Sequence, residues 1–219
     1  MFNTQRTGVA PKSLLSKTRY DGEDVYIKLC EIFFEKCYIC ETKEPHDIHV
    51  EHFSSHKGDI EKEFDWNNLY LACSRCNSIK STAFDNILDC CDPAIDVFRA
   101  IRHVPPITPW ANSVLLIAMN SDEKTISTLR LLDRVYNSEH SVNKKVSGKF
   151  IRTKIFDQYN LLFTQINAYY SPVATEQDQA QALSRMQKLI KKSEPYSAFV
   201  RWCLLDDQKL GPMLSEYMD

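Results

Sequence analysis

Two pairs of closely spaced cysteines constrain the fold of this 219-residue chain more than any other feature. Cys37 and Cys40 form one C-x-x-C pair, and Cys73 and Cys76 form the second. Such a turn holds two thiolates at an angle that suits one tetrahedral ion, and four thiolates are a common ligand set of structural Zn²⁺. The spacing therefore predicts a four-cysteine zinc site, and the alternative is four unrelated buried thiols.

The composition is that of a globular protein of the cytoplasm. The longest apolar run, from Val114 to Met119, is far below the length of about 18 residues that a membrane span needs. The first residues lack the apolar core of a signal peptide. In the cytoplasm, the eight cysteines are expected to be thiols or metal ligands rather than disulfides. The five glycines argue against a glycine-rich phosphate loop.

The net charge of −2 hides an uneven distribution. Residues 1–20 are basic and carry no acid, residues 21–65 are strongly acidic, and residues 141–160 are basic again. A nucleic-acid binder that works alone is usually more basic than this. We interpret the run at 141–160 as a solvated face, and residues 1–20 as a basic arm that is disordered or bound to a partner.

Hydrophobic periodicity predicts a mainly helical chain with a small α+β unit around the cysteines. The alternating stretch 46–53 is expected to be a strand, and residues 68–80 an extended piece followed by a helix that begins near Cys73. The prolines between His103 and Pro109 suggest a linker. The expected units are thus an arm at 1–20, a zinc-site domain at 21–102 and a helical domain at 110–219. Further helices are expected at 21–36, where Asp21 would be the cap, and at 125–135, 142–170, 175–192 and 195–209, the last ending at Gly211-Pro212.

A second group of polar residues lies between and after the cysteine pairs. It contains the neighbours Glu51 and His52, the two amide side chains of Asn68 and Asn77, and the positively charged Lys80. Asn77 and Lys80 would share a helix face. Glu51 and His52 would point to opposite faces of a regular strand, so they can serve one site only if the strand ends, bends or bulges there. A purely structural zinc module has no need for this set.

The strings C-Y-I-C, E-H-F and N-N-L-Y-L-A-C-S-R-C-N-S-I-K resemble the HNH endonucleases. The resemblance implies a ββα-metal core framed by the four-cysteine zinc site, and hydrolysis of nucleic-acid phosphodiester bonds. It also implies roles for individual residues. His52 would be the general base, Asn68 would brace the loop that presents it, Glu51 and Asn77 would bind a catalytic Mg²⁺ or Mn²⁺, and Lys80 and Arg75 would contact phosphate.

The motifs over residues 25–100, with D-W-N-N-L at 65–69 and D-P at 92–93, are similar to the PtuB nuclease subunits of Septu anti-phage systems. Relatives of these subunits also serve as effectors of some retron systems. The resemblance implies an ATPase partner of the PtuA type, which the arm 1–20 or the helices within 141–209 would contact. The expected substrate is DNA, with tRNA or another RNA as the alternative.

Two interpretations of function remain open. The first is a metal-dependent nuclease, and the polar set around His52 favours it. The second is a zinc-stabilised binding module for nucleic acid or protein that has lost activity, and the acidity of the zinc-site region favours it. His49 and His56 are expected to be surface histidines, with an extra metal ligand as the alternative for His49, and Cys90 and Cys91 receive no role.

Overall fold

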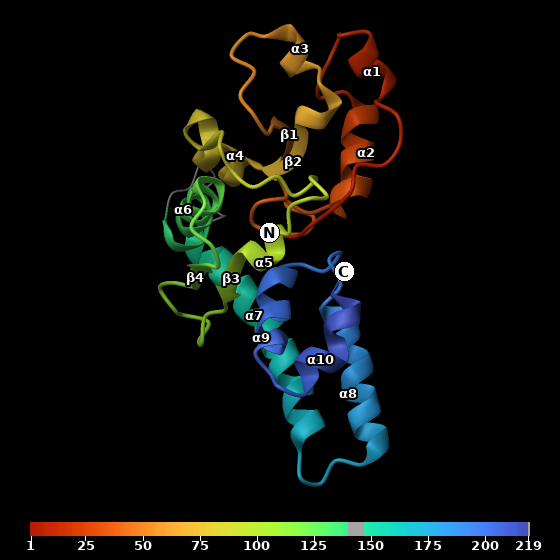
Figure 1. Ribbon diagram of the computed structural model, residues 1–219, viewed down its shortest axis with the longest axis vertical. Helices are drawn as coiled ribbons and strands as arrows, with labels where there is room; N and C mark the ends of the chain where they lie inside the picture. Colours follow the sequence, from red (N-terminus) through yellow and green to blue (C-terminus); the bar gives the residue numbers. More distant parts are fainter. Residues whose placement is uncertain (140–146, 219) are drawn as a thin grey trace.

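A computed structural model of the protein describes residues 1–139 and 147–218 (Figure 1). The described residues form a mixed α+β structure that is mostly helical, with two small antiparallel sheets. Short 3₁₀ turns lie at Trp66–Asn68, Ser81–Phe84 and Ser215–Tyr217. The elements up to residue 118 are α1 (Lys12–Leu15), α2 (Glu23–Phe33), β1 (Ile48–His52), α3 (Ile60–Glu63), β2 (Leu69–Cys73), α4 (Ser74–Lys80), α5 (Val97–Ala100), β3 (Ile101–Val104) and β4 (Leu115–Ala118).

The first sheet pairs β1 with β2, and α4 follows β2 without a break. The pairing is regular, with Glu51 opposite Tyr70 and His52 opposite Leu69. Every residue of β2 is buried, which explains its continuous apolar sequence. The order β1, β2, α4 is the strand–strand–helix unit expected from the sequence; the first cysteine pair precedes it, and the second lies where β2 meets α4.

Helix α2 covers this sheet with the apolar face predicted from its periodicity, formed by Val25, Leu29, Ile32 and Phe33. The helix is shorter than expected. It begins at Glu23, because Asp21 pairs with Arg19 instead of capping the first turn. It ends at Phe33, because the next two residues adopt the left-handed conformation and turn the chain toward the first cysteine pair.

The first residues of the chain pack into the core, in contrast to the expectation of a disordered or partner-bound arm. Met1 and Phe2 are each 1% exposed. The backbone N–H of Thr4 donates to the carbonyl oxygen of Cys90 over 2.9 Å. The guanidinium of Arg6 donates to the carbonyl oxygen of Leu69 and lies over the Tyr70 ring, 4.6 Å from its centroid. This end of the segment is therefore part of the zinc-site region.

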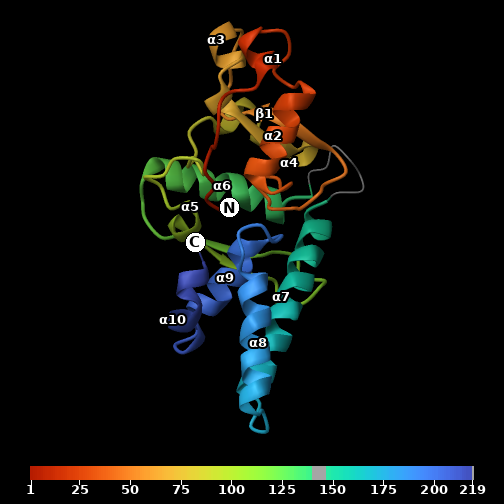
Figure 2. The ribbon, with the colours of Figure 1, turned by 90° about the vertical axis from the view of Figure 1, so that its right-hand side faces the viewer.

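The remaining helices follow the second sheet. Helices α7 and α8 form an antiparallel pair that projects away from the first sheet in both views (Figures 1 and 2). Thr175 and Asp178 form the expected reciprocal cap at the start of α8. The predicted start of the long helix at 142 lies outside the described residues. These helices are α6 (Glu123–Asn137), α7 (Gly148–Tyr170), α8 (Glu176–Leu189), α9 (Ser197–Leu205) and α10 (Leu210–Leu214).

The predicted last helix ends earlier than expected, at Leu205, and a further helix, α10, starts at Leu210 after a short turn. Gly211 and Pro212 lie inside the first turn of α10, where proline is tolerated because its missing N–H has no helical acceptor. A small core forms where α7, α8, α9 and α10 meet. It contains Leu162, Met186, Leu204, Leu210 and Leu214.

The segment predicted as a linker begins inside a packed strand and continues as the loop between β3 and β4. His103 belongs to β3, is 1% exposed and lies edge-on against the rings of Tyr136 and Phe199. The main core contains residues on both sides of this point, from Val97 to Phe199. The division of the chain into domains stays a prediction. In the part of the chain that the structure describes, no helix combines the length and apolarity that membrane crossing requires.

Candidate functional site

The four cysteines of the two C-x-x-C pairs meet at one point. Cys37 and Cys40 lie on the turn after α2, Cys73 ends β2, and Cys76 lies in the first turn of α4. Their sulfur atoms are all within 4.8 Å of one another, and the Sγ atoms of Cys40 and Cys73 are 3.9 Å apart. All four are buried. Four converging buried thiols fit a tetrahedral Zn²⁺ that is closed to substrate.

The first cysteine turn is held by backbone bonds and by buried ion pairs of Glu41. The Tyr38 N–H donates to the carbonyl oxygen of Leu71, which attaches the turn to β2. Glu41 follows the turn, and its carboxylate binds the Lys36 ammonium at 3.2 Å, the N-terminal ammonium at 3.1 Å and the Ser197 hydroxyl at 2.8 Å. Burial by itself would raise the pKa of Glu41, but Lys36, the N-terminal ammonium and the other groups around the carboxylate together outweigh this effect, and the pKa is lowered. Glu41 thus connects the zinc turn to α9.

Glu51 lies on the inner face of β1. It is 4% exposed, and its Oε1 accepts a hydrogen bond from the Tyr38 hydroxyl and lies 3.8 Å from the Lys80 ammonium. Burial raises the pKa of Glu51, although Lys80 and Tyr38 act in the opposite direction. A carboxylate held in this way does not fit a ligand of a solvent-accessible cation. The regular pairing of β1 is the reason, since it keeps Glu51 and His52 on opposite faces.

His52 lies on the other face, at the end of β1. Its Nε2 is 3.0 Å from the carbonyl oxygen of Glu63. A carbonyl oxygen can only accept, so Nε2 carries the proton and Nδ1 of the neutral ring keeps its lone pair. Burial lowers the pKa of His52, and the bond to the Glu63 backbone opposes part of this effect. The imidazole is therefore neutral at pH 7 and able to take up a proton.

Asn68 joins the two ends of the loop between β1 and α3. Its amide nitrogen donates to the carbonyl oxygens of Ser54 at 2.9 Å and Lys62 at 3.0 Å. Its amide oxygen accepts from the Ser54 N–H at 2.8 Å. Lys62 is next to Glu63, so Asn68 also positions the carbonyl group that orients His52. A side-chain amide can donate two hydrogen bonds and accept one from the same planar group, and Asn68 uses all three here.

The other residues predicted for this site lie apart from His52 or face inward. Asn77 is half-buried on α4. Lys80 is 2% exposed, and its ammonium donates to the carbonyl oxygen of His52 at 3.1 Å. Arg75 is 1% exposed and donates to the carbonyl oxygen of Ser138 at 2.7 Å. Both basic side chains are thus buried and bonded to backbone carbonyl oxygens, and their contact with phosphate stays a prediction.

Two residues that the sequence did not point to contact the His52 ring. The rings of Tyr20 and His56 each lie with their centroid 4.7 Å from that of His52. Tyr20 comes from the segment between α1 and α2, and His56 from the loop after β1. No spacing in the sequence relates Tyr20 to His52, because the contact depends on how the N-terminal segment folds back. The proximity of His56 to His52 was a weak signal, and we expected a surface residue.

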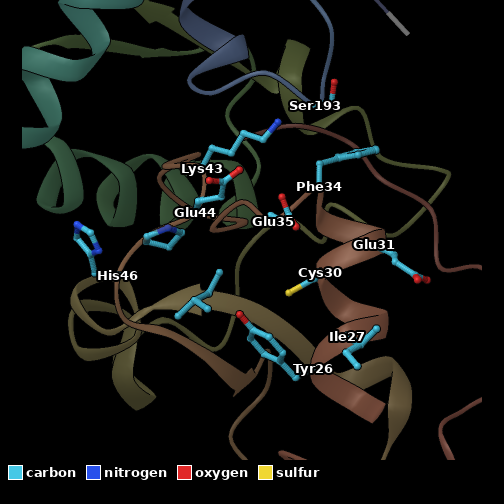
Figure 3. A pocket seen from close by; sticks show the side chains of 12 residues that line it. Tyr26, Ile27, Cys30, Glu31, Phe34, Glu35, Lys43, Glu44, His46 and Ser193 are labelled. Atoms are coloured by element: carbon cyan, nitrogen blue, oxygen red, sulfur yellow. The ribbon is translucent and has the colours of Figure 1, made fainter. Parts of the chain in front are cut away.

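A separate cavity of about 780 Å³ lies on the other side of α2 (Figure 3). Tyr26, Ile27 and Cys30 of α2 form one wall, and Lys43 and His46 of the first cysteine turn face them. His52, Asn68 and Asn77 are not among its lining residues. The cavity is thus distinct from the group around His52.

Comparison with known proteins identifies the family of this region. Residues 37–83 match the family model of the HNH endonucleases. A comparison with curated protein sequences gave no match. The matched segment contains all four cysteines, both strands of the first sheet, and the residues His52 and Asn68. The segment 37–83 is therefore similar to the HNH endonucleases.

Proposed function

We propose that this protein is an endonuclease that hydrolyses nucleic-acid phosphodiester bonds, with His52 as the general base. The observation that carries the proposal is the hydrogen bond between His52 Nε2 and the Glu63 carbonyl oxygen. It selects the tautomer whose Nδ1 can take a proton, and the lowered pKa of His52 keeps that atom unprotonated at neutral pH.

The reaction follows from this geometry. Nδ1 of His52 removes a proton from a water molecule, and the water oxygen attacks phosphorus. The bond from phosphorus to the 3′ oxygen breaks, and that oxygen takes up a proton from the solvent, which leaves a 5′ phosphate and a 3′ hydroxyl. Charge on the imidazolium is stabilised by the Glu63 carbonyl, which faces the protonated Nε2. Asn68 keeps that carbonyl in place through its bond to Lys62.

HNH nucleases use divalent metal ions, and a Mg²⁺ or Mn²⁺ would stabilise the charge on the departing oxygen. Of the two ligands expected from the sequence, Asn77 is half-buried on α4, whereas Glu51 is bound by Tyr38 and Lys80. The buried set Glu51–Lys80 does not fit this ion. The zinc site is assigned a structural role, because four thiolates leave no open position.

A cleavage assay tests the function. Supercoiled plasmid DNA and total tRNA are incubated with the protein and Mg²⁺ or Mn²⁺, and wild type is compared with His52→Ala and with the exposed-histidine control His49→Ala. We expect cleavage by wild type and His49→Ala, and a loss of at least 100-fold for His52→Ala. We expect DNA to be the preferred substrate. Equal cleavage by His52→Ala and wild type would refute the assignment of the base.

The inactive binding module is supported by one specific observation: Glu51, Lys80 and Arg75 are all buried. If neither substrate is cleaved while one zinc per chain is bound, this second function replaces the first. Binding of labelled DNA or RNA by the uncut protein would then identify the ligand.

We also propose that the protein is the effector subunit of an anti-phage complex with an ATPase partner of the PtuA type. Two features support an external partner. The acidic region 21–65 gives the HNH domain a weak electrostatic attraction for nucleic acid. The α7–α8 pair projects from the rest of the chain and offers a large surface (Figure 2). Co-expression with a candidate ATPase tests the idea by size exclusion, and two separate peaks would contradict it.

A further inference from the structure

Tyr20 contacts the candidate base from a distant part of the sequence. Its ring centroid lies 4.7 Å from that of His52, with the two ring planes inclined by 54°. His56 contacts the same imidazole at the same centroid distance from the loop after β1. His52 is thus held by one hydrogen bond to Glu63 and by two ring contacts from different segments.

The chain just before Tyr20 is attached to two other elements. On one side, the Lys17 ammonium pairs with the Glu61 carboxylate of α3. On the other side, Ser13 of α1 donates from its hydroxyl to the Asp24 carboxylate of α2 over 2.6 Å. Helices α1 and α3 lie side by side at one end of the molecule in both views (Figures 1 and 2). The N-terminal segment and the loop that carries His56 therefore pack against the His52 imidazole together.

The two ring contacts restrict rotation of the His52 imidazole, which the hydrogen bond to Glu63 alone does not. Rotation of an imidazole about its last torsion is soft and roughly two-fold, so a single hydrogen bond does not by itself prevent a flip. A flipped ring would present a carbon where Nδ1 now lies, and proton transfer would stop. Rings packed against the imidazole oppose this rotation through dispersion and edge-to-face attraction. The phenol hydroxyl of Tyr20 is not needed for this effect, since the ring provides the contact.

We propose, on the basis of the function proposed above, that Tyr20 is a positioning residue of the endonuclease, which with His56 holds the His52 imidazole so that Nδ1 faces the attacking water. The residues 17–20 are then part of the active site, although they lie outside the HNH segment 37–83. The titratable groups that act on His52 are Glu63, His56 and Lys80, and a substitution at Tyr20 alters none of these residues.

The test compares Tyr20→Ala, Tyr20→Phe and the control Tyr26→Ala, whose side chain is 39% exposed on α2 and lines the separate cavity. Steady-state cleavage of plasmid DNA gives kcat and KM. The ¹⁵N spectrum of histidine-labelled protein gives the tautomer of His52, with its signals assigned by difference from His52→Ala. Thermal unfolding checks that each variant is folded at the assay temperature.

We expect Tyr20→Ala to lower kcat about tenfold with KM unchanged, and to mix the two His52 tautomers. Tyr20→Phe and Tyr26→Ala should keep the wild-type kcat and the single wild-type tautomer of His52. A rise in KM alone, or wild-type kcat and a single tautomer in Tyr20→Ala, would overturn the proposal. The two failures are distinguishable. If His52→Ala cleaves as well as wild type, the proposed base is wrong, whereas an unchanged tautomer in Tyr20→Ala refutes the positioning role alone.

Discussion

Removal of the Asn68 side chain tests whether one amide holds the loop that orients His52. Asn68→Ala deletes two donated bonds, to Ser54 and Lys62, and one accepted bond from the Ser54 N–H. Each is worth about 0.5–1.5 kcal/mol net. Ser54 and Lys62 lie close enough to solvent for water to replace some of these hydrogen bonds. We therefore expect the free energy of unfolding to fall by about 2 kcal/mol.

Asn68→Asp provides a sharper version of the same test. The carboxylate still accepts from Ser54, but it faces the carbonyl oxygens of Ser54 and Lys62 without a proton to donate. We therefore expect a loss about 1 kcal/mol larger than that of the alanine variant. The two substitutions rank in this order only if donation by the amide nitrogen is the main contribution.

Urea unfolding of the zinc-loaded protein measures the free energy, and hydrogen exchange followed by mass spectrometry locates the change. Exchange should rise in residues 53–64 and stay constant in α8. Asn67→Ala is the matched control, because this neighbouring side chain is exposed. The reasoning is refuted if Asn68→Ala lies within about 0.5 kcal/mol of wild type, the usual range of surface substitutions, with unchanged exchange.

Three further outcomes are expected. Chelation of zinc, or Cys73→Ser, should abolish cooperative unfolding of the HNH region, because metal binding and folding are coupled there; an unchanged circular dichroism spectrum after complete metal removal would contradict this. Lys36→Met should destabilise the chain by about 3 kcal/mol, the lower end of the cost of breaking a buried ion pair, since the Glu41 carboxylate keeps only the N-terminal ammonium as a charged partner; Lys124→Met at an exposed position of α6 is the control, and equal midpoints in urea would count against the ion pair. Burial, aided by the N-terminal ammonium, lowers the pKa of His103 to about 3. Protonation of His103 therefore favours the unfolded chain. The contribution of the neutral ring to the free energy of unfolding is fully present above about pH 6.5, and the free energy of unfolding falls by about 2 kcal/mol between pH 7 and pH 5. His103→Phe should flatten this slope, and an identical slope in the variant would disprove the assignment.

The sequence predicted those parts of the molecule in which residues close in the chain act together. The C-x-x-C pairs meet because each pair is a local turn and the intervening strands form one hairpin. The cap at Thr175 and Asp178 is likewise a contact over three residues. The apolar face of α2 follows from helical periodicity alone. For such features, short-range geometry leaves few alternatives.

The ends of elements were predicted less well, and the reason is tertiary packing. Helix α2 ends earlier than predicted because Phe34 and Glu35 adopt the left-handed conformation. The loop that follows is held by the ion pair Lys36–Glu41 and by the bond from Ser197 of α9 to Glu41. The sequence also did not indicate β3, which ends just before the prolines and is completed by a hydrogen-bonded partner, β4, and by the ring of Phe199. Neither partner is visible in the local sequence.

By itself, the sequence determined that four cysteines converge beside a strand–strand–helix unit carrying His52 and Asn68, because residue type and spacing specify this within one HNH segment. The tertiary structure decided which side chains share an environment. It directs Glu51 and Lys80 inward as a buried pair and brings Tyr20 onto the His52 ring. These outcomes depend on which face of β1 is covered and on where a distant segment folds back, and such long-range packing leaves no periodic signal in the chain.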